Sequence, residues 1–287
     1  MEWIDRLNAA MRHIEANLTG EIDLQELGRI ACCSSYHFQR MFTYIAGVSL
    51  SEYIRRRRMS LAAVELQSGE LKVIDAAAKY GYNSPTAFNR AFQSVHGIAP
   101  SAVRNAGVAL KSCPPLRFVV SVRGAQELEY RIESRPAFRI VGLSQPLHPE
   151  VEKNFEIVPG MWAQAMQSGA IPRLASMMNA DPLGLLGMSF CNRQGDWSYW
   201  IAVASSLPEG DFESVTVPAY TWAVFPGSGA GAAIQELERR IVTEWLPDSG
   251  YEYADGPDVE VYLSPDPADA RFEVWIPVVR ARVKECE

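Results

Sequence analysis

The chain has 287 residues, of which 48% are hydrophobic and 21% are charged, and its formal net charge is −7. These values are typical of a globular protein, and the length suffices for two domains with a core each. No apolar run approaches the roughly 20 residues of a membrane-spanning helix, and the N-terminus lacks the layout of a secretory signal. We therefore expect a cytoplasmic protein that does not contact the membrane.

Five cysteines and four histidines are scattered without the spacing of a metal site, so we expect reduced thiols and neither a metal nor a cofactor. The sequence contains no evident serine–histidine pair or phosphate-binding loop, and we do not predict an enzyme. Residues 1–106 carry 12 Lys and Arg against 10 Asp and Glu, a net of +2, and the remainder carries 15 against 24, a net of −9. Bulk charge therefore does not indicate nucleic acid, and any such prediction depends on geometry.

Apolar residues at helical spacing from Ile4 to Leu18 predict a first amphipathic helix. Asp23 followed by Glu26 resembles a capping box that opens a short helix through about Ile30. Ser34 then caps a further short helix whose apolar face is Phe38, Met41, Phe42 and Ile45, and Gly47 ends it. Helix, tight turn and helix in this order predict a helix-turn-helix unit.

The same pattern returns fifty residues later. A long helix over about 50–67 separates the copies, and the second copy has a support helix at 73–80, a turn at 81–83 and a reading helix at 85–96, opened by Ser84 and Pro85. The residues that coincide are Ser34/Ser84, Phe38/Phe88, Arg40/Arg90, Phe42/Phe92, Gly47/Gly97 and Ser51/Ser101. Two matched helices of this kind can enter two neighbouring segments of the DNA major groove.

The face of each reading helix away from its phenylalanines is expected to meet solvent or DNA. It carries Tyr36, His37, Gln39 and Arg40 in the first copy and Thr86, Asn89 and Arg90 in the second. Arginine can bond guanine in a bidentate way, and Gln or Asn can bond adenine. The alternative is the solvated face of a helical bundle, and the second copy favours DNA. In the run Arg55–Arg58 we expect one or two side chains, Arg55 and Arg56, to touch phosphate and the others to pair with carboxylates.

Residues 1–106 resemble the DNA-binding domain of the AraC/XylS family of transcription regulators. The matching residues include Phe38-Gln39-Arg40-Met41-Phe42, Gly81-Tyr82 and Phe88-Asn89-Arg90-Ala91-Phe92. The resemblance implies that double-stranded DNA is a partner, with RNA polymerase as an open alternative for a docking role. It places base-reading residues at Tyr36, Gln39, Arg40, Pro85, Thr86, Asn89 and Arg90, where Pro85 departs from the polar residues often found.

Residues 107–127 read as a linker with a stretch of strand over 116–122, and residues 128–287 read as an α+β domain. Arg135-Pro136-Ala137-Phe138 and Val217-Pro218-Ala219-Tyr220 lie 82 residues apart, and each is followed by a helix (about 156–167 and 230–246) and two strands. We predict two strand–helix–strand–strand halves in one pseudo-twofold sheet. The fold class is therefore multidomain, with an all-α double helix-turn-helix domain first.

Glu273 stands in an apolar strand on the same face as Trp275, so it is expected to be exposed, paired, or the partner of a ligand. Glu260, two residues before Tyr262, is a weaker candidate of the same kind. The pocket candidates are Trp162, Tyr199, Trp200, Tyr220, Trp222, Tyr262 and Trp275, with a plain aromatic core as the alternative.

This half resembles the GyrI-like effector-binding domain found in multidrug-responsive regulators, including Rob-like members of the AraC family. The matching residues are Pro136-Ala137-Phe138, Val217-Pro218-Ala219-Tyr220, Glu260-Val261-Tyr262 and Phe272-Glu273-Val274-Trp275-Ile276-Pro277. The resemblance implies a regulator that senses a small lipophilic, often cationic effector, with Glu273 in the groove. The alternatives are a small-molecule hydrolase using Glu273 and a protein-docking module.

Overall fold

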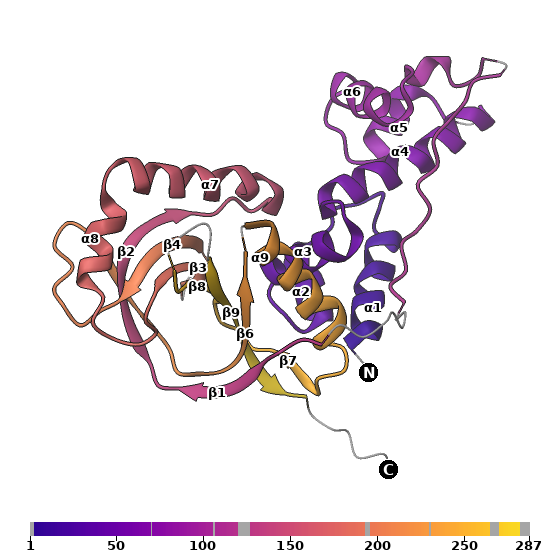
Figure 1. The fold of residues 1–287 in the computed structure, drawn as a ribbon. Helices are drawn as coiled ribbons and strands as arrows, with labels where there is room; N and C mark the ends of the chain where they lie inside the picture. The colour runs from indigo at the N-terminus through magenta and orange to yellow at the C-terminus, as the bar shows by residue number, and fades with distance from the viewer. Residues whose placement is uncertain are drawn as a thin grey trace, which may run out of the picture. The chain divides into compact units, whose positions relative to one another are not determined.

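The structure is a computed structural model, and it describes residues 3–69, 71–105, 107–119, 127–192, 196–229, 231–264 and 270–281. The chain divides into two compact units, Met1–Ser121 and Val122–Glu287 (Figure 1). Within the described ranges, no helix is long and apolar enough to cross a membrane.

The regular elements that the structure describes in the first unit are all helices. Its elements are α1 (Trp3–Ala16), α2 (Leu24–Ala31), α3 (Ser35–Ala46), α4 (Leu50–Ser68), α5 (Val73–Lys79), α6 (Pro85–His96) and the short 3-10 helix η1 (Pro100–Ala102). The prediction of a duplicated helix-turn-helix is confirmed, and α6 begins and ends at the predicted residues.

Matching cap residues explain why α3 and α6 form at matching places. The Ser34 hydroxyl accepts a hydrogen bond from the amide of His37, and the Ser84 hydroxyl accepts one from Ala87, each at 3.1 Å. Gly47 and Gly97 end the two helices at φ of 67° and 78°, in the left-handed region that glycine enters at little cost.

One predicted cap is only partly formed. Asp23 caps α2 by accepting from the amide of Gln25 at 2.8 Å. The Glu26 carboxylate instead pairs with Arg29 one turn later, so the reciprocal bond of a capping box is replaced by an ion pair along the helix.

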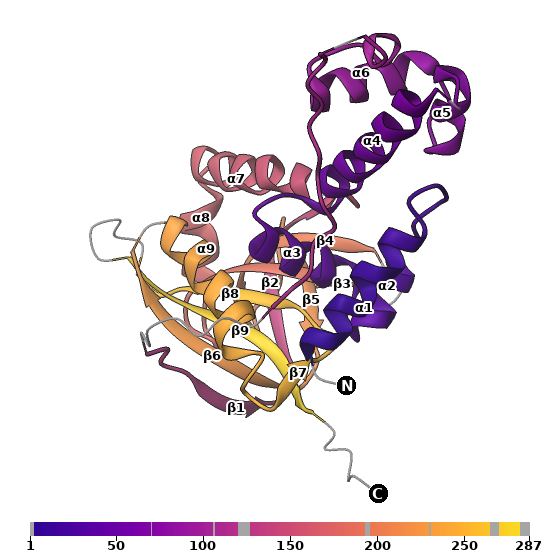
Figure 2. The same ribbon diagram turned by 90° about the vertical axis from the view of Figure 1, so that its right-hand side faces the viewer.

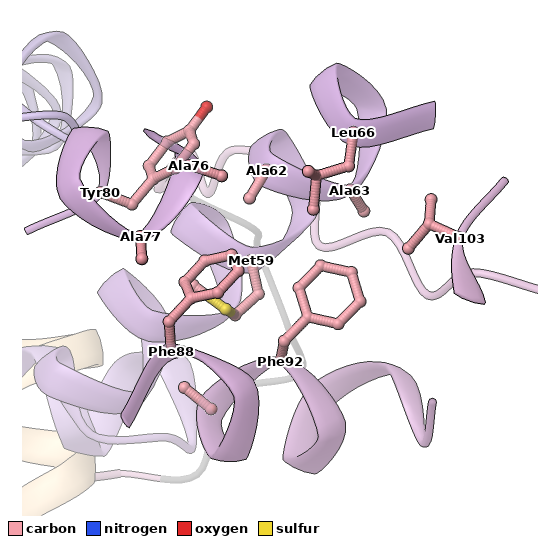
Figure 3. Packing of buried hydrophobic residues seen from close by; sticks show 11 residues of the cluster. Met59, Ala62, Ala63, Leu66, Ala76, Ala77, Tyr80, Phe88, Phe92 and Val103 are labelled. Atoms are coloured by element: carbon pink, nitrogen blue, oxygen red, sulfur yellow. The ribbon is translucent and has the colours of Figure 1, made fainter. Parts of the chain in front are cut away.

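The core of the second helix-turn-helix unit lies between α4, α5 and α6. In Figure 3 the rings of Phe88 and Phe92 point from α6 toward Met59 on α4, with Ala77 of α5 beside them. Both rings are 0% exposed and their centroids lie 5.8 Å apart. In the first helix-turn-helix the equivalent ring, that of Phe42, packs against Tyr53, and the two ring centroids lie 5.5 Å apart. The repeated phenylalanines thus anchor each reading helix to the central helix α4.

The second unit combines helices with one antiparallel sheet (Figures 1 and 2). Its elements are β1 (Arg131–Arg135), β2 (Phe138–Pro146), α7 (Val151–Gln167), α8 (Ala170–Met177), β3 (Leu185–Cys191), β4 (Trp197–Ala204), β5 (Glu213–Val217), β6 (Tyr220–Ser228), α9 (Gly231–Arg240), the π-helix η2 (Ile241–Trp245), β7 (Tyr251–Tyr253), β8 (Asp258–Tyr262) and β9 (Arg271–Arg280). The helix α7 begins five residues earlier than predicted, and the predicted helix over 230–246 changes from α9 to η2 near its end.

The strand order confirms the pseudo-twofold prediction. Within the described residues the order is β1-β6-β9-β8-β3-β4-β2-β5, with β7 paired to β9. The strands β2, β4 and β3 of the first half thus match β6, β9 and β8 of the second. The edge strands are exchanged between the halves. The strand β1 of the first half pairs with β6 of the second, and β5 of the second half pairs with β2 of the first.

The hydrogen-bond register places the symmetry axis between two residues. Ile201 pairs with Gly187 in the first half, and Val274 pairs with Glu260 in the second, 73 residues later in both cases (201 to 274 and 187 to 260). Gly187 and Glu260 are therefore equivalent positions, and they pair directly with each other across β3 and β8. The axis passes between a glycine and a glutamate.

The predicted strand over 116–122 is not formed at residues 116–119, and residues 120–122 lie outside the described ranges. Residues 107–119, predicted to begin a linker, lie against the helices of the first unit, where their amides bond to helix side chains rather than to a neighbouring strand.

Candidate DNA-reading helices and effector site

The outward face of α6 is open. Pro85, Thr86 and Arg90 are exposed and Asn89 is half-buried, opposite the buried Phe88 and the rest of the core. In the part of the chain that the structure describes, no carboxylate lies within ion-pair distance of Arg90. An exposed, uncommitted guanidinium beside an amide side chain has the donors and acceptors needed to read base edges.

The corresponding face of α3 differs from this expectation. Tyr36 and Gln39 are buried, at 8% and 7% exposed, and Arg40 is half-buried. The Gln39 amide donates to the carbonyl of Ser35 on its own helix at 3.4 Å, and the Arg40 guanidinium donates to the Tyr44 hydroxyl at 3.2 Å. The outward face is therefore exposed on α6, whereas Tyr36 and Gln39 of α3 are buried in this structure.

The four arginines of α4 divide into two pairs. Arg55 and Arg56 both pair with Glu52 on the helix surface, with side chains 45% and 47% exposed. Arg57 is buried against Glu15 at 2.7 Å, and Arg58 donates to the carbonyls of Leu18 and Gly20. Arg57 and Arg58 hold the fold, which leaves Arg55 and Arg56 accessible for phosphate.

In the second unit, one sheet face and the helix α7 bring an acid and three aromatic residues together. Neighbours that pair across antiparallel strands share a face, and alternate residues of one strand share it too. Gly187 pairs with Glu260, and Ser189 pairs with Tyr199. The residues on this face are therefore Gly187, Tyr199, Glu260 and Tyr262. We refer to Trp162, Tyr199, Glu260 and Tyr262 as the axial cluster.

The helix α7 adds a tryptophan to this cluster. The indole N–H of Trp162 donates to the Tyr199 hydroxyl at 3.0 Å, and its ring lies edge-on to Tyr262 with centroids 5.1 Å apart. The Tyr262 hydroxyl donates to Glu260 Oε2 at 2.6 Å. The carboxylate thus lies beside aromatic side chains from a helix and two strands.

Electrostatics make the axial cluster negative. Burial raises the pKa of Tyr262 above its ordinary value, and the charge of nearby Glu260 raises it further, with a smaller contribution from Glu238 of α9. Tyr262 therefore stays protonated and donates its hydroxyl hydrogen to Glu260. Glu238 is 7% exposed, and no strand alternation or repeat marks it in the sequence. A carboxylate beside aromatic rings is a chemically suitable partner for a cation with an apolar body.

Glu273, the predicted effector acid, lies elsewhere. It pairs with Val261 and not with Glu260, so it faces the opposite side of the sheet from the axial cluster. Its carboxylate accepts two bonds from the Arg131 guanidinium, at 2.8 and 3.1 Å, and one from the Trp275 indole at 2.8 Å. Burial raises the pKa of Glu273, but these hydrogen bonds outweigh it and leave the pKa below its usual value.

Three other aromatic residues predicted for the site lie on the same face of the sheet as Glu273. Trp275 is 1% exposed, and its ring packs against Trp222 at 5.7 Å, which in turn contacts Tyr220 at 5.4 Å. Arg135 stacks on the Trp275 ring at 4.4 Å. These side chains pack together in the core on the face of the sheet opposite the axial cluster. Trp162, Tyr199 and Tyr262 converge with Glu260, and Glu273, Trp275 and Tyr220 do not join them.

Gly187 leaves room for the axial cluster, and Gly187→Ala tests this. A Cβ there would lie 2.3 Å from the Tyr199 hydroxyl and 3.1 Å from Glu260 Oε2. We expect the substitution to displace Tyr199 from Trp162 and to lower the free energy of unfolding by about 1–3 kcal/mol. Tryptophan fluorescence and chemical unfolding measure the two effects. Gly160→Ala is the control, because a Cβ at Gly160 of α7 meets nothing within 4 Å. If the two variants had the same free energy of unfolding, a Cβ at position 187 would not crowd Tyr199 and Glu260.

Comparison with known families agrees with both units. Residues 128–279 match the model of the GyrI-like small molecule binding domain, and residues 27–106 match a helix-turn-helix domain. The first match covers more than half of the chain. In the described ranges, no group of three or more His, Cys, Asp or Glu side chains could hold a metal ion.

Curated relatives fall into two groups. The transcriptional activator AarP of Providencia stuartii is 44% identical over 91 residues, covering 32% of this chain and 67% of the relative. The regulatory protein SoxS of Salmonella typhimurium is 36% identical over 105 residues, covering 37% of this chain and 89% of its own length. The right origin-binding protein of Escherichia coli K12 is 24% identical and matches 93% of this chain and 96% of its own. The chain therefore belongs to the AraC/XylS family of DNA-binding transcription regulators and carries a C-terminal GyrI-like small-molecule-binding domain.

Proposed function

We propose that this regulator reads a specific DNA site with α3 and α6 and senses a small lipophilic cation at the axial cluster. The observation that carries the sensing part is the convergence of Trp162, Tyr199 and Tyr262 on the Glu260 carboxylate. Effector binding changes DNA binding only if the effector prefers one conformation of the protein, so the proposal includes a shift between states of different DNA affinity.

For DNA we assign base reading on α6 to Asn89 and Arg90, with Pro85 and Thr86 at the helix start against the groove. The support is their exposure on one face of a capped helix. On α3 we propose Tyr36, Gln39 and Arg40 for the neighbouring groove segment. Arg55 and Arg56 are proposed to touch phosphate, which positions the protein without reading sequence.

For the effector we assign Glu260 as the acceptor of positive charge and the three aromatic side chains as the apolar walls. A cation over aromatic faces gains about 0.5–2 kcal/mol for each good contact, and a carboxylate in a partly buried site adds to it. An anion would meet both Glu260 and Glu238 and be repelled. Cationic dyes are therefore expected to bind, and bile-salt-like anions are not.

Arg90→Ala tests the DNA part. A duplex that the protein selects from random sequence serves as the site, and we expect the variant to bind it about tenfold more weakly while specificity relaxes at one base pair. Arg173→Ala is the control, since it removes the same charge from an exposed position on α8. Gel-shift titration measures both. An equal loss on random duplexes would assign Arg90 to phosphate contact and contradict base reading.

The similarity to transcription regulators also supports three further parts of the proposal: a cytoplasmic location, RNA polymerase as a partner of the DNA-bound protein, and no enzymatic role. Glu273 fits poorly as the base of a hydrolase, because its lowered pKa makes it a weak proton acceptor and Arg131 occupies its oxygens. Pull-down from extract with and without promoter DNA tests the polymerase contact.

A further inference from the structure

The segment Leu110–Phe118, which follows the last helix of the first unit, has neither helix nor strand but is held at regular intervals. We call it the brace. Four of its amides donate to side chains on helices: Lys111 to His96 Nδ1 at 3.2 Å, Cys113 to Ser60 Oγ at 2.9 Å, Leu116 to Tyr53 Oη at 3.0 Å and Phe118 to Asn8 Oδ1 at 2.9 Å. The Asn8 amide returns a bond to the Phe118 carbonyl at 2.9 Å. These bonds replace the backbone partners that a strand would supply.

The two ends of the brace are anchored in different helix-turn-helix units. Phe118 is 8% exposed, and its ring meets that of Phe42 on α3 at 6.1 Å. Leu110 packs against the core between α4 and α6, and the amide of Lys111 donates to His96 Nδ1 at 3.2 Å. His96 is the last residue of α6, so the brace touches both reading helices.

The middle of the brace is tied to a buried ion pair. The Arg57 guanidinium, 8% exposed, bonds Glu15 of α1 and also donates to the Cys113 carbonyl. Tyr53 donates to the same glutamate at 2.6 Å while it accepts from Leu116. Releasing the brace would take the Cys113 carbonyl away from the Arg57 guanidinium. This loss is unfavourable, because a buried charge is stable only when its hydrogen bonds are satisfied.

We propose that the brace fixes the distance between the two reading helices and thereby sets which spacing of the two DNA half-sites the protein accepts. Half-sites read from one side of the duplex lie about 34 Å apart. The second helix-turn-helix unit binds at an effective concentration that depends on how firmly its position is held. Asn8 and Phe118 are the positioning residues, and neither is expected to touch DNA.

The test compares Phe118→Ala and Asn8→Ala with the control Val119→Ala, all in the full chain. Val119 adjoins Phe118 but is 72% exposed. Three duplexes are titrated: the site selected by the wild type from random DNA, the same site with one base pair inserted between its halves, and one half alone. We expect the brace variants to bind the selected site about tenfold more weakly and to prefer it over the lengthened site several-fold less, since a looser tie lowers effective concentration and tolerates misplacement. The affinity of the brace variants for the half-site, and all affinities of the control variant, should stay within about twofold of the wild type.

A folded brace variant with the wild-type spacing preference would overturn the proposal, and so would an equal loss on the half-site. If Phe118→Ala does not fold, Asn8→Ala and amide hydrogen exchange decide. The proposal requires the amides of Cys113, Leu116 and Phe118 to exchange as slowly as those of α4 in the wild type. Exchange at the rate of an unstructured peptide would rule it out. The Arg90→Ala variant tests base reading separately, through its affinity for the half-site. A failure of the proposed DNA reading can therefore be told apart from a failure of the brace proposal.

Discussion

Phe92→Ala is expected to lower the free energy of unfolding of the N-terminal unit by about 3–5 kcal/mol. The ring is 0% exposed and lies 5.8 Å from Phe88 and 4.3 Å from His96. The ring packs against buried residues of the neighbouring helices (Figure 3), and its removal leaves a cavity there. Because a domain of this size has about 5–15 kcal/mol in total, DNA binding near 37 °C should fall sharply.

Urea unfolding followed by far-ultraviolet circular dichroism measures this change, and Val64→Ala is its control. Val64 lies on α4 next to the core residue Ala63 but is 65% exposed. Its truncation should alter stability by less than about 0.5 kcal/mol. If both substitutions cost the same, Phe92 does not hold α6 to the central helix.

Glu260→Gln is expected to weaken the binding of a lipophilic cation such as rhodamine 6G by about 1.5–3 kcal/mol, roughly 10- to 150-fold. Glutamine keeps an oxygen that can accept from the Tyr262 hydroxyl, so the cluster retains its geometry and loses only its charge. Fluorescence anisotropy titration gives the dissociation constants. Deoxycholate should bind the wild type poorly and gain affinity in the variant, because the repelling charge is gone.

Glu273→Gln is the matched control, since it makes the same chemical change in an equally apolar strand. The substitution removes the ion pair with Arg131, whose side chain is 44% exposed, and should leave dye affinity within about twofold. The reverse outcome, with Glu273 essential and Glu260 dispensable, would move the effector to the opposite face of the sheet. Equal affinity in both variants would show that charge does not hold the dye.

The helical unit was predictable from sequence because its signals are local. Cap serines, terminal glycines and phenylalanines at helical spacing each act within one helix, and the fifty-residue repeat shows them twice. The brace had no such signal. Its bonds join single side chains such as Asn8 and Ser60 to a segment more than fifty residues away, and neither periodicity nor composition marks those residues.

The effector site was predicted only in part because sheet faces depend on distant pairing. Glu260 precedes Tyr262 by two residues, and Glu273 precedes Trp275 by two, so both strands show the same acid–aromatic pattern. Alternation gives the face within each strand but not which of the two faces α7 covers. The register of β8 against β3 and β9 puts Glu260 and Glu273 on opposite faces, and the contacts of Trp162 with Tyr199 and Tyr262 show which face α7 covers.

The axis between Gly187 and Glu260 has a consequence for how such a site can arise. A homodimer of identical halves would place the same residue at both positions. Two glutamates would face each other and repel, and two glycines would leave a gap without charge. Only a fused duplication lets the two copies diverge, so that one supplies the acid and the other the space beside it. Joining the halves in one chain is therefore what permits a single, off-centre charge at the midpoint of a symmetric sheet.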